Sequence, residues 1–366
     1  MKVAIIGAGV MGLMTARELV RAGCEVLLLE RGIAGQEASW AGGGIVSPLY
    51  PWRYSAPVTA LASAAQYIYP QLAEELRQET GIDPEFIRSG LLMLDANDAR
   101  DAEAWAAMNQ HQLQRWAAAD LQVRMPGLDK CWHEGLWMPA IANIRNPRLL
   151  KSLRRSLELQ GVMLHEQVQV TGWQRANAHV TAAIAADGRA FAADAFVICS
   201  GAWSKEIFAQ ASSTTLAVRP VRGQMLLYKL APGALPCIVM AEGRYVIPRA
   251  DGHILCGSTL EEVGFDKSTT EEARASLMAS ALRLWPALSG QQPVAHWAGL
   301  RPGAPNGIPF IGRVPEQENL WVNAGQFRNG LVLAPASARL LADQLLGRAT
   351  QLDARPYQLM PVVAGP

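Results

Sequence analysis

The chain has few of the features that mark membrane, metal-binding or nucleic-acid-binding proteins. Its 366 residues include five cysteines, none in a Cys-x-x-Cys pair or another metal-ligand spacing, so no metal site is predicted. No run of about 18 uninterrupted apolar residues is present, which argues against a membrane-spanning helix. The formal net charge is +1 and no basic stripe stands out, so a nucleic-acid partner is not expected. We expect a soluble protein with a small-molecule partner.

The cysteines and the first residues also bear on the cellular compartment. Five is an odd number, and Met1-Lys2 leads directly into an apolar run, which leaves no room for a secretory leader. We therefore expect a protein of the reducing cytoplasm, with the cysteines inside apolar runs buried as small hydrophobic residues. Half of the residues are hydrophobic and 18% are charged, so the chain can bury a large core and is expected to form two domains.

The first thirty residues carry the most informative motif. An apolar run at residues 3–6 enters a turn with Gly7, Gly9 and Gly12, and after a helix-like segment a second apolar run ends on Glu30. This order of strand, glycine turn, helix, strand and acid is typical of a unit that binds an adenine dinucleotide. At this point the dinucleotide can be NAD or FAD, and a glycine-rich turn in an unrelated βαβ unit is the alternative.

Each residue of this motif has a physical role. Gly7 permits the tight turn, and Gly9 lets the backbone approach a pyrophosphate. Gly12 lets the helix pack close to the strand, so that the helix N-terminus faces the phosphates. Glu30 is expected to accept hydrogen bonds from the adenosine ribose.

The pattern of apolar residues predicts helices and strands along the rest of the chain. Helices are expected at residues 58–80, 97–119, 147–160, 271–284 and 336–346. Strands are expected at residues 89–94, 162–164, 168–170, 180–184, 195–199, 219–230, 245–248 and 253–257. The run at 195–199 ends in small residues, as a buried parallel strand does, whereas the short strands after 219 are typical of an antiparallel sheet. The last dozen residues are expected to be loosely ordered.

Five segments together carry a resemblance to a known family. They are the glycine motif at 7–12, Ser-Trp-Ala-Gly-Gly-Gly at 39–44, Gly-Ala-Trp-Ser at 201–204, Trp-Ala-Gly-Leu-Arg-Pro at 297–302 and Gly-Gln-Phe-Arg-Asn-Gly at 325–330. In combination the chain resembles the D-amino-acid oxidase (DAO) family of flavoproteins over essentially its whole length. Within that family it is most similar to the glycine oxidases linked to thiamine biosynthesis.

The resemblance implies an α/β fold with a Rossmann-like FAD-binding domain and an α+β substrate domain built on an antiparallel sheet. The FAD-binding domain is expected to be discontinuous, with residues 1–88, 145–212 and 299–366. Residues 89–144 and 213–298 are then expected to form the substrate domain.

The resemblance also implies that FAD lies extended across the first domain. No cysteine follows Cys256, where relatives with a covalent flavin carry one, so FAD is expected to be non-covalent. In this reading Val10 and Met11 lie at the pyrophosphate, and the backbone of Val168 contacts the adenine. The implied cofactor-binding residues are Gly7, Gly9, Val10, Met11, Gly12, Glu30, Arg31, Ala38, Ser39, Gly43, Gly44, Ile45, Val168, Gly201, Gln326, Phe327, Arg328, Asn329, Gly330, Leu331 and Val332.

Three residues are implied at the substrate. Arg301 is expected to bind the substrate carboxylate, with Tyr245 and Arg328 nearby. An arginine can hold a carboxylate bidentately, which orients the substrate Cα, and a tyrosine adds a hydroxyl and an apolar ring. Each has an alternative interpretation: a surface-turn arginine for Arg301, an ordinary strand tyrosine for Tyr245, and a bond to a protein carbonyl or carboxylate for Arg328.

The implied activity is oxidative deamination of glycine, sarcosine and small D-amino acids, with hydride transfer from the substrate Cα to flavin N5. Molecular oxygen accepts the electrons, and the products are the 2-oxo acid (glyoxylate from glycine), ammonia or an amine, and hydrogen peroxide. No residue is proposed as a catalytic acid or base, because a substrate that enters as the neutral amine needs none. The resemblance further suggests a homotetramer. The alternatives are a D-amino-acid dehydrogenase that reduces a quinone and the flavin module of an RNA-modifying protein.

Overall fold

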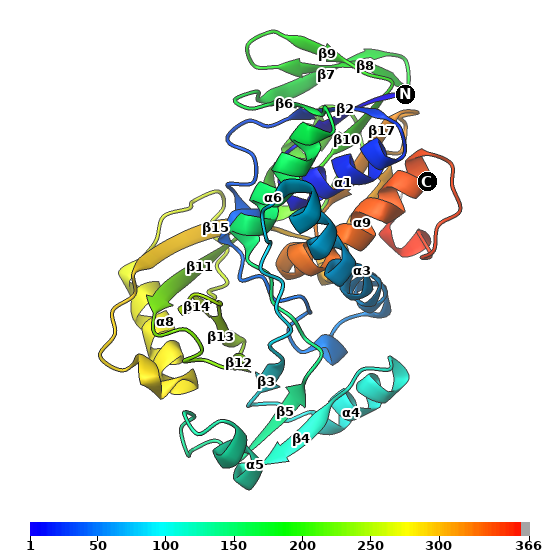
Figure 1. The fold of residues 1–366 in the computed structure, drawn as a ribbon. Coiled ribbons are helices and arrows are strands. Elements are labelled where there is room, and N and C mark those ends of the chain that lie inside the picture. The colour runs from blue at the N-terminus through cyan, green and yellow to red at the C-terminus, as the bar shows by residue number, and fades with distance from the viewer. Residues whose placement is uncertain (360–366) are drawn as a thin grey trace, which may run out of the picture.

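Residues 1–359 are described by the computed structural model, and they form a six-stranded, an eight-stranded and a three-stranded sheet with helices packed around them (Figure 1). The helices are α1 (Val10–Arg21), α2 (Ala38–Ala41), α3 (Ala56–Thr80), α4 (Ala99–Met108), α5 (Ala118–Arg124), α6 (Asn146–Leu159), α7 (Ser204–Ala209), α8 (Glu271–Leu284) and α9 (Gly330–Leu345). The strands are β1 (Lys2–Ile6), β2 (Glu25–Leu29), β3 (Leu91–Met93), β4 (Gln114–Ala117), β5 (Glu134–Met138), β6 (Met163–His165), β7 (Val170–Ala176), β8 (His179–Ala185), β9 (Ala190–Ala192), β10 (Ala195–Ile198), β11 (Arg219–Lys229), β12 (Ile238–Ala241), β13 (Arg244–Pro248), β14 (His253–Gly257), β15 (Ala295–Gly303), β16 (Phe310–Arg313) and β17 (Leu320–Ala324). Short 3-10 helices are η1 (Pro51–Arg53), η2 (Gly201–Trp203), η3 (Pro286–Leu288), η4 (Pro305–Gly307), η5 (Phe327–Asn329) and η6 (Arg355–Tyr357).

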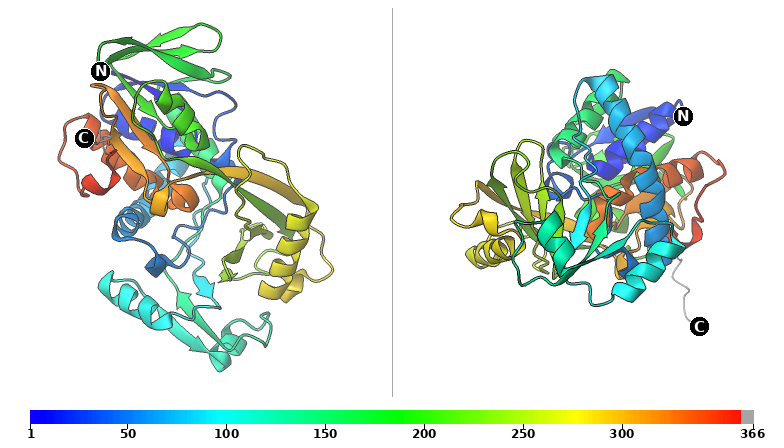
Figure 2. Two further views of the ribbon diagram at one scale, coloured as in Figure 1. Left: turned by 180° about the vertical axis from the view of Figure 1, so that it is seen from behind. Right: turned by 60° about the horizontal axis from the view of Figure 1, so that its bottom comes forward.

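The six-stranded sheet forms the Rossmann-like half of the molecule. Its strand order is β16-β17-β10-β1-β2-β6, and every pair except β16 with β17 is parallel. Helices α1, α3, α6 and α9 cover one face, and α7 with the three-stranded sheet covers the other (Figures 1 and 2). The central residues Val3, Ala4 and Ile5 are therefore fully buried. Because parallel strands end at one edge, the residues after β1, β2 and β10 meet there.

The eight-stranded sheet forms the second half. Its order is β15-β11-β14-β13-β12-β3-β5-β4, and all pairs except β12 with β3 are antiparallel. Helix α8 covers the face that lies away from the parallel sheet (Figure 2). The predicted fold class is confirmed. The predicted domain boundaries stay a prediction, and strand β15 continues in this sheet as far as Gly303.

The predicted helix at 97–119 is wrong in its second half. The helix α4 ends at Met108, and the chain then forms β4, which pairs with β5. On β4 the side chain of Trp116 is buried and stacks on Trp137 of β5, with ring centroids 4.8 Å apart. Pairing with a strand some twenty residues further along outweighs the local helical pattern, because cross-strand aromatic pairs stabilise a sheet.

Helix α9 begins at Gly330, ahead of its predicted start at 336, and it contains Pro335. Proline has no N–H, so the carbonyl of Leu331 four residues earlier loses its helical partner. The hydroxyl of the fully buried Tyr69 in α3 donates a hydrogen bond to this carbonyl instead. A side chain from another helix therefore allows proline inside α9. Helices α3, α6 and α8 lie close to their predicted bounds.

The last described residues are ordered against α3. Tyr357 in η6 is buried, and its hydroxyl donates to the carbonyl of Pro57 at 2.7 Å. The expected loose order is wrong for residues 355–359, and residues 360–366 lie outside the described part of the chain. None of the helices within residues 1–359 combines the length and the hydropathy needed to cross a bilayer.

A buried arginine joins three of the helices on the parallel sheet. The side chain of Arg17 in α1 is 2% exposed, and it pairs with Glu79 at 2.6 Å and Glu75 at 3.2 Å, both in α3. The hydroxyl of Ser156 in α6 donates to Glu79 at 2.7 Å. The hydrogen bond from Arg17 lowers the pKa of Glu79 from its usual 4.5 to about 2.

This shift predicts how acid affects stability. Because the folded pKa of Glu79 lies below its usual value, its contribution is complete above about pH 4.5 and is lost as the pH falls toward 2. Glu79→Gln is expected to lower the free energy of unfolding by about 1–2 kcal/mol at pH 7, and by less as the pH falls. Denaturant unfolding at several pH values measures this. Glu74→Gln, which removes an exposed i,i+3 pair with Arg77, is the control and should change little. An unchanged difference at acidic pH contradicts the prediction.

Candidate active site

A cavity of about 370 Å³ lies where the carboxyl edge of the parallel sheet meets the eight-stranded sheet. The ends of β1, β2 and β10 contribute Ile6, Leu29 and Cys199 to its wall. The eight-stranded sheet contributes Tyr245 from β13 and Arg301 from β15. The first turns of α1 and α9 complete the wall, so the cavity collects residues from both sheets and from both ends of the chain.

Most of the residues predicted for the cofactor or the substrate lie on this wall. They are Gly7, Gly9, Val10, Met11, Glu30, Arg31, Ala38, Ser39, Gly43, Gly44, Ile45, Val168, Gly201, Gln326, Phe327, Arg328, Gly330, Leu331 and Val332, together with Tyr245 and Arg301. Two predicted cofactor residues, Gly12 and Asn329, do not line it. Asn329 is buried between η5 and α9, behind the wall that its neighbours form.

The glycine turn brings the start of α1 against β1 and β10. Gly7 has a φ of +101°, and a Cβ on it would lie 2.5 Å from the carbonyl oxygen of Cys199. A Cβ on Gly12 would lie 1.9 Å from the carbonyl oxygen of Gly7, so Gly12 serves the close packing of the helix. At the N-terminus of α1 the N–H of Val10 donates to the hydroxyl of Ser39 at 2.9 Å. The positive end of α1 thus faces the cavity, as anion binding requires.

Glu30 follows β2 at the edge of the cavity, and backbone N–H groups hold its carboxylate. One oxygen accepts the N–H of Ala8 at 2.8 Å, and the other accepts the N–H of Gly32 at 2.9 Å. A carboxylate has about four acceptor sites, so Glu30 can still accept a ribose hydroxyl. The two backbone bonds fix the orientation in which it does so.

An aromatic and ionic cluster lies beside the cavity next to Glu30, and its members Arg31, Glu37 and Trp203 line the cavity wall. The guanidinium of Arg31 lies 3.5 Å from the ring centre of Trp203, and Trp203 stacks on Phe265 with centroids 5.4 Å apart. Glu37 pairs with Arg31 at 2.9 Å and with Lys267 at 3.0 Å. Phe265 and Lys267 belong to a loop, residues 258–270, that follows β14. Sequence reasoning missed this contact, because no local pattern links residues 31, 203 and 265.

The second glycine-rich segment, residues 39–44, runs along the cavity wall next to Tyr245. A Cβ on Gly43 would lie 3.2 Å from the Tyr245 ring, and Gly44 has a φ of +80°. The side-chain amide of Asn146 in α6 donates to the carbonyl of Ser39 at 2.7 Å, which holds the start of the segment. Trp40, an unusually large residue for this motif, does not line the cavity and instead packs edge-on against another tryptophan of β15.

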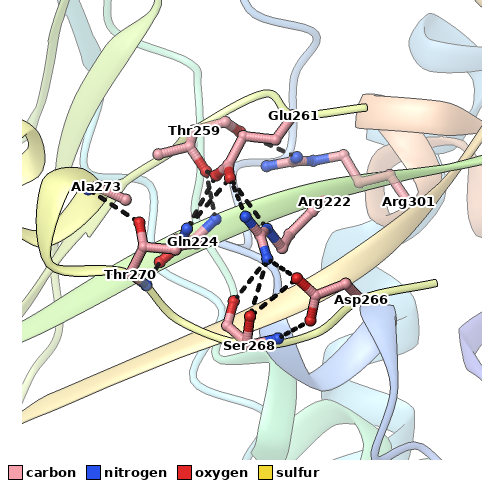
Figure 3. A network of polar contacts seen from close by, with 9 residues as sticks. All are labelled: Arg222, Gln224, Thr259, Glu261, Asp266, Ser268, Thr270, Ala273 and Arg301. Carbon is pink, nitrogen blue, oxygen red and sulfur yellow. Dashed lines mark hydrogen bonds and ion pairs between the residues drawn. The ribbon is translucent and has the colours of Figure 1, made fainter. Parts of the chain in front are cut away.

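Arg301, the residue predicted to bind the substrate carboxylate, lies on the part of the cavity wall that the eight-stranded sheet contributes. Its Nη2 donates to the hydroxyl of Ser258 at 2.7 Å. Its Nη1 donates to the carbonyl of Thr259 at 3.2 Å (Figure 3). Burial lowers the pKa of Arg301, and the nearby charge of Arg328 lowers it further. Within residues 1–359 no carboxylate lies at ion-pair distance from Arg301. The guanidinium is therefore a partly buried cation that a carboxylate in the cavity can neutralise.

Tyr245 and Arg328 flank Arg301. Tyr245 is 7% exposed, and its hydroxyl donates to the sulfur of Met225 at 3.6 Å, a weak bond that a better acceptor can replace. Arg328 in η5 is exposed on the wall, and it has no hydrogen-bond or ion-pair partner among residues 1–359. The alternative in which a protein carbonyl or carboxylate holds Arg328 is thus not observed.

Gly223 in β11 makes room for Arg301. A Cβ on Gly223 would lie 2.0 Å from Nη1 of Arg301, because the guanidinium crosses the backbone of the neighbouring strand at this point. Sequence reasoning did not assign this residue. A glycine inside a predicted strand is the signal that could have found it, since such glycines often mark a close approach.

The loop that holds Arg301 is anchored by a buried polar network (Figure 3). Arg222 in β11 is 4% exposed and donates to Glu261 at 3.0 Å and to Asp266 at 2.6 Å. The side-chain amide of Gln224 donates to Glu261 at 3.0 Å, and the Thr259 hydroxyl also binds Glu261. The network fixes Thr259, whose carbonyl accepts from Arg301, so the position of the guanidinium is set by residues that line no part of the cavity.

Comparisons with known proteins agree with this geometry. The family model described as FAD-dependent oxidoreductase (DAO) matches residues 2–344. A protein of Pseudomonas aeruginosa named glycine oxidase is 52% identical over 97% of this chain and 98% of its own length. The crystal structure of glycine oxidase from Geobacillus kaustophilus superposes with a TM-score of 0.93 at 29% identity and covers 99% of both chains. A Synechocystis protein named bifunctional ThiO/ThiG is 31% identical over 94% of this chain, which spans 51% of that protein.

Proposed function

Because the chain belongs to the DAO family of FAD-dependent oxidoreductases, we propose that it is a glycine oxidase that holds FAD non-covalently in the cavity between its two sheets. One observation carries the proposal: Arg301, a partly buried cation without a carboxylate partner among residues 1–359, lies on the same cavity wall as the residues suited to the cofactor. A small substrate with one carboxylate fits that arrangement.

The donors and acceptors of the cavity fit FAD in order along its length. Glu30 supplies a carboxylate for the ribose, and the positive end of α1 suits the pyrophosphate. Glycines at 9, 43 and 44 leave space where side chains would fill the wall. The start of α9, at Gly330, is the positive end of a helix dipole, which suits a ring that gains negative charge. When bound, FAD supplies the acceptor for the substrate hydride and the route of the electrons to oxygen.

The residues of the chain bind and orient the substrate. Arg301 holds the carboxylate with its fork, and the hydroxyl of Tyr245 leaves the Met225 sulfur to donate to the same carboxylate. Arg328 adds a second positive charge at the mouth of this pocket. A carboxylate fixed at these points leaves the Cα hydrogen directed along the cavity, and orientation of this kind contributes several kcal/mol to catalysis. The chain needs no general base if glycine enters as the neutral amine.

The proposed reaction converts glycine, water and oxygen to glyoxylate, ammonia and hydrogen peroxide. Sarcosine and small D-amino acids are proposed as further substrates, with methylamine or ammonia as the amine product. The relationship to the bifunctional ThiO/ThiG protein supports a role in supplying the thiazole of thiamine. The cytoplasmic location and the homotetramer stay predictions.

Anaerobic addition of glycine to the purified, yellow protein tests the proposal. We expect the flavin absorbance to bleach, and air to restore the colour with formation of about one equivalent of hydrogen peroxide per turnover. Dithionite, which reduces flavin without the substrate pocket, is the control. A flavin that dithionite bleaches but that glycine, sarcosine and D-alanine leave oxidised contradicts the proposal. Reduction by these amino acids without peroxide in air indicates a dehydrogenase instead.

A further inference from the structure

Arg249, the residue after β13, is a buried cation behind the second glycine-rich segment. The residue is 4% exposed, and its Nη2 donates to the carbonyl of Gly43 at 2.8 Å. Its Nη1 donates to Oδ1 of Asn143 at 2.7 Å and to the carbonyl of Ile144 at 3.0 Å. Burial lowers the pKa of Arg249 to about 10, which leaves the side chain charged at neutral pH.

No carboxylate within residues 1–359 forms an ion pair with Arg249. The nearby Glu85 and Asp251 both pair with Arg145, at 3.1 and 2.9 Å. Among residues 1–359 Arg249 has only neutral acceptors, and its Nε has no hydrogen-bond partner. An ion buried without a counter-ion costs several kcal/mol of folding free energy. A neutral side chain with N–H groups could donate to the same acceptors. The hydrogen bonds alone therefore do not explain why a charged residue is buried at this position.

The bond to Gly43 sets which way the next peptide groups face. In a trans peptide the C=O and the following N–H point in opposite directions, and the Gly43 carbonyl points toward Arg249, away from the cavity. The N–H of Gly44 therefore points to the cavity that Gly44 lines. The carbonyl of Gly44 likewise accepts from the N–H of Ile144 at 2.8 Å, which turns the N–H of Ile45 to the cavity. Neither N–H has a hydrogen-bond partner within residues 1–359.

We propose that Arg249 is a positioning residue for the flavin: it directs the N–H groups of Gly44 and Ile45 to the ring system, and its buried charge behind them favours the reduced cofactor. This inference rests on the proposed function only in that FAD occupies the cavity. Reduction gives the ring negative charge, and a cation in a low-dielectric surrounding stabilises such charge more strongly than it would in water. Gly43 lines the cavity and its carbonyl lies 2.8 Å from the guanidinium, so the charge lies directly behind the cavity wall.

Two substitutions separate the charge from the hydrogen bonds. Arg249→Met removes both, whereas Asn143→Asp places a carboxylate where the amide oxygen now accepts from Nη1 at 2.7 Å, which neutralises the charge and keeps the bond to Gly43. We expect both variants to lower the equilibrium constant for two-electron reduction of bound FAD at least about ten-fold, or about 30 mV in midpoint potential. Only Arg249→Met is expected to weaken FAD binding as well, since it alone frees the Gly43 carbonyl.

The measurements are the midpoint potential of bound flavin and the dissociation constant of FAD, neither of which requires turnover. Arg17→Met is the matched control: it removes another buried arginine, one that pairs with Glu75 and Glu79, and it should lower stability without changing the potential. Asn143→Asp keeps the test valid if Arg249→Met does not fold. Wild-type potentials in every folded variant of Arg249 and Asn143 overturn the inference. A protein whose FAD shows these shifts but is not reduced by glycine contradicts the proposed function alone.

Discussion

Replacement of Arg301 by alanine is expected to weaken glycine binding by about 30-fold to several thousand-fold, because truncating one partner of a buried, hydrogen-bonded charge pair costs about 2–5 kcal/mol. Within residues 1–359 the guanidinium donates to the Ser258 hydroxyl and the Thr259 carbonyl and has no carboxylate at ion-pair distance, so the substrate carboxylate is expected to be its main electrostatic partner. FAD binding should persist, since Arg301 lies at the substrate end of the cavity. Anaerobic titration of the flavin absorbance with glycine measures the dissociation constant.

Two further variants sharpen this test. Arg301→Lys keeps the charge but loses the planar fork, so it is expected to bind glycine more weakly than the wild type and more tightly than Arg301→Ala. Arg313→Ala removes an exposed arginine of β16 and should leave glycine binding unchanged. If Arg301→Ala binds glycine as the wild type does while its flavin is fully incorporated, the assignment of the carboxylate site fails.

The second large effect is expected from Gly12→Ala in the first turn of α1. Glycine to alanine in a helix normally stabilises by about 1 kcal/mol. Here the new Cβ would lie 1.9 Å from the carbonyl oxygen of Gly7, a backbone atom that no side-chain rotation can move. The helix must shift away from the turn, and overpacking of this kind costs about 1–3 kcal/mol or more. We expect the protein to be purified largely without FAD and to unfold at lower temperature.

The control for this variant is Gly172→Ala. Gly172 lies in β7 without a positive φ, and a Cβ added to it would have no heavy atom within 4 Å, so the substitution should be neutral or slightly stabilising. FAD content, read from the ratio of flavin to protein absorbance, and the unfolding temperature measure both effects. Full FAD content and an unchanged unfolding temperature in Gly12→Ala show that the helix tolerates the methyl group and contradict the packing role of Gly12.

The predictions for Arg301 and Gly12 concern residues that the sequence singles out. Their expected effects depend on interatomic distances, which the sequence does not give. The spacing of Gly7, Gly9 and Gly12 predicts a helix close to a strand, since the whole motif lies within one turn and one helix. The neighbours of Arg301 come from two strands, a loop and a 3-10 helix, and Gly223 matters only because β11 pairs with β15 at that point. Contacts between residues far apart in the chain, such as that of Arg301 with Gly223, leave no pattern in the local sequence.

The errors of prediction have the same origin. Residues 114–117 have a helical pattern and form a strand, because β5 offers a partner for Trp116. Residues 330–335 lie ahead of the predicted helix, and they are helical despite Pro335 because the Tyr69 hydroxyl satisfies the carbonyl that proline leaves free. In each case a side chain or strand far along the chain supplies the interaction that decides the local conformation.

By itself the sequence determined the class of the fold, the glycine motif, the family resemblance and most of the residues that line the cavity. These features are encoded within short segments, where residue type alone sets the backbone's freedom and the chemistry of the side chain. Only the tertiary structure decided that Arg301 is a partly buried cation without a carboxylate partner among residues 1–359, that Trp203 of the cavity wall stacks on Phe265, and that Arg249 holds the carbonyl of Gly43. Burial and charge pairing depend on which distant segments meet, and that is a property of the folded chain.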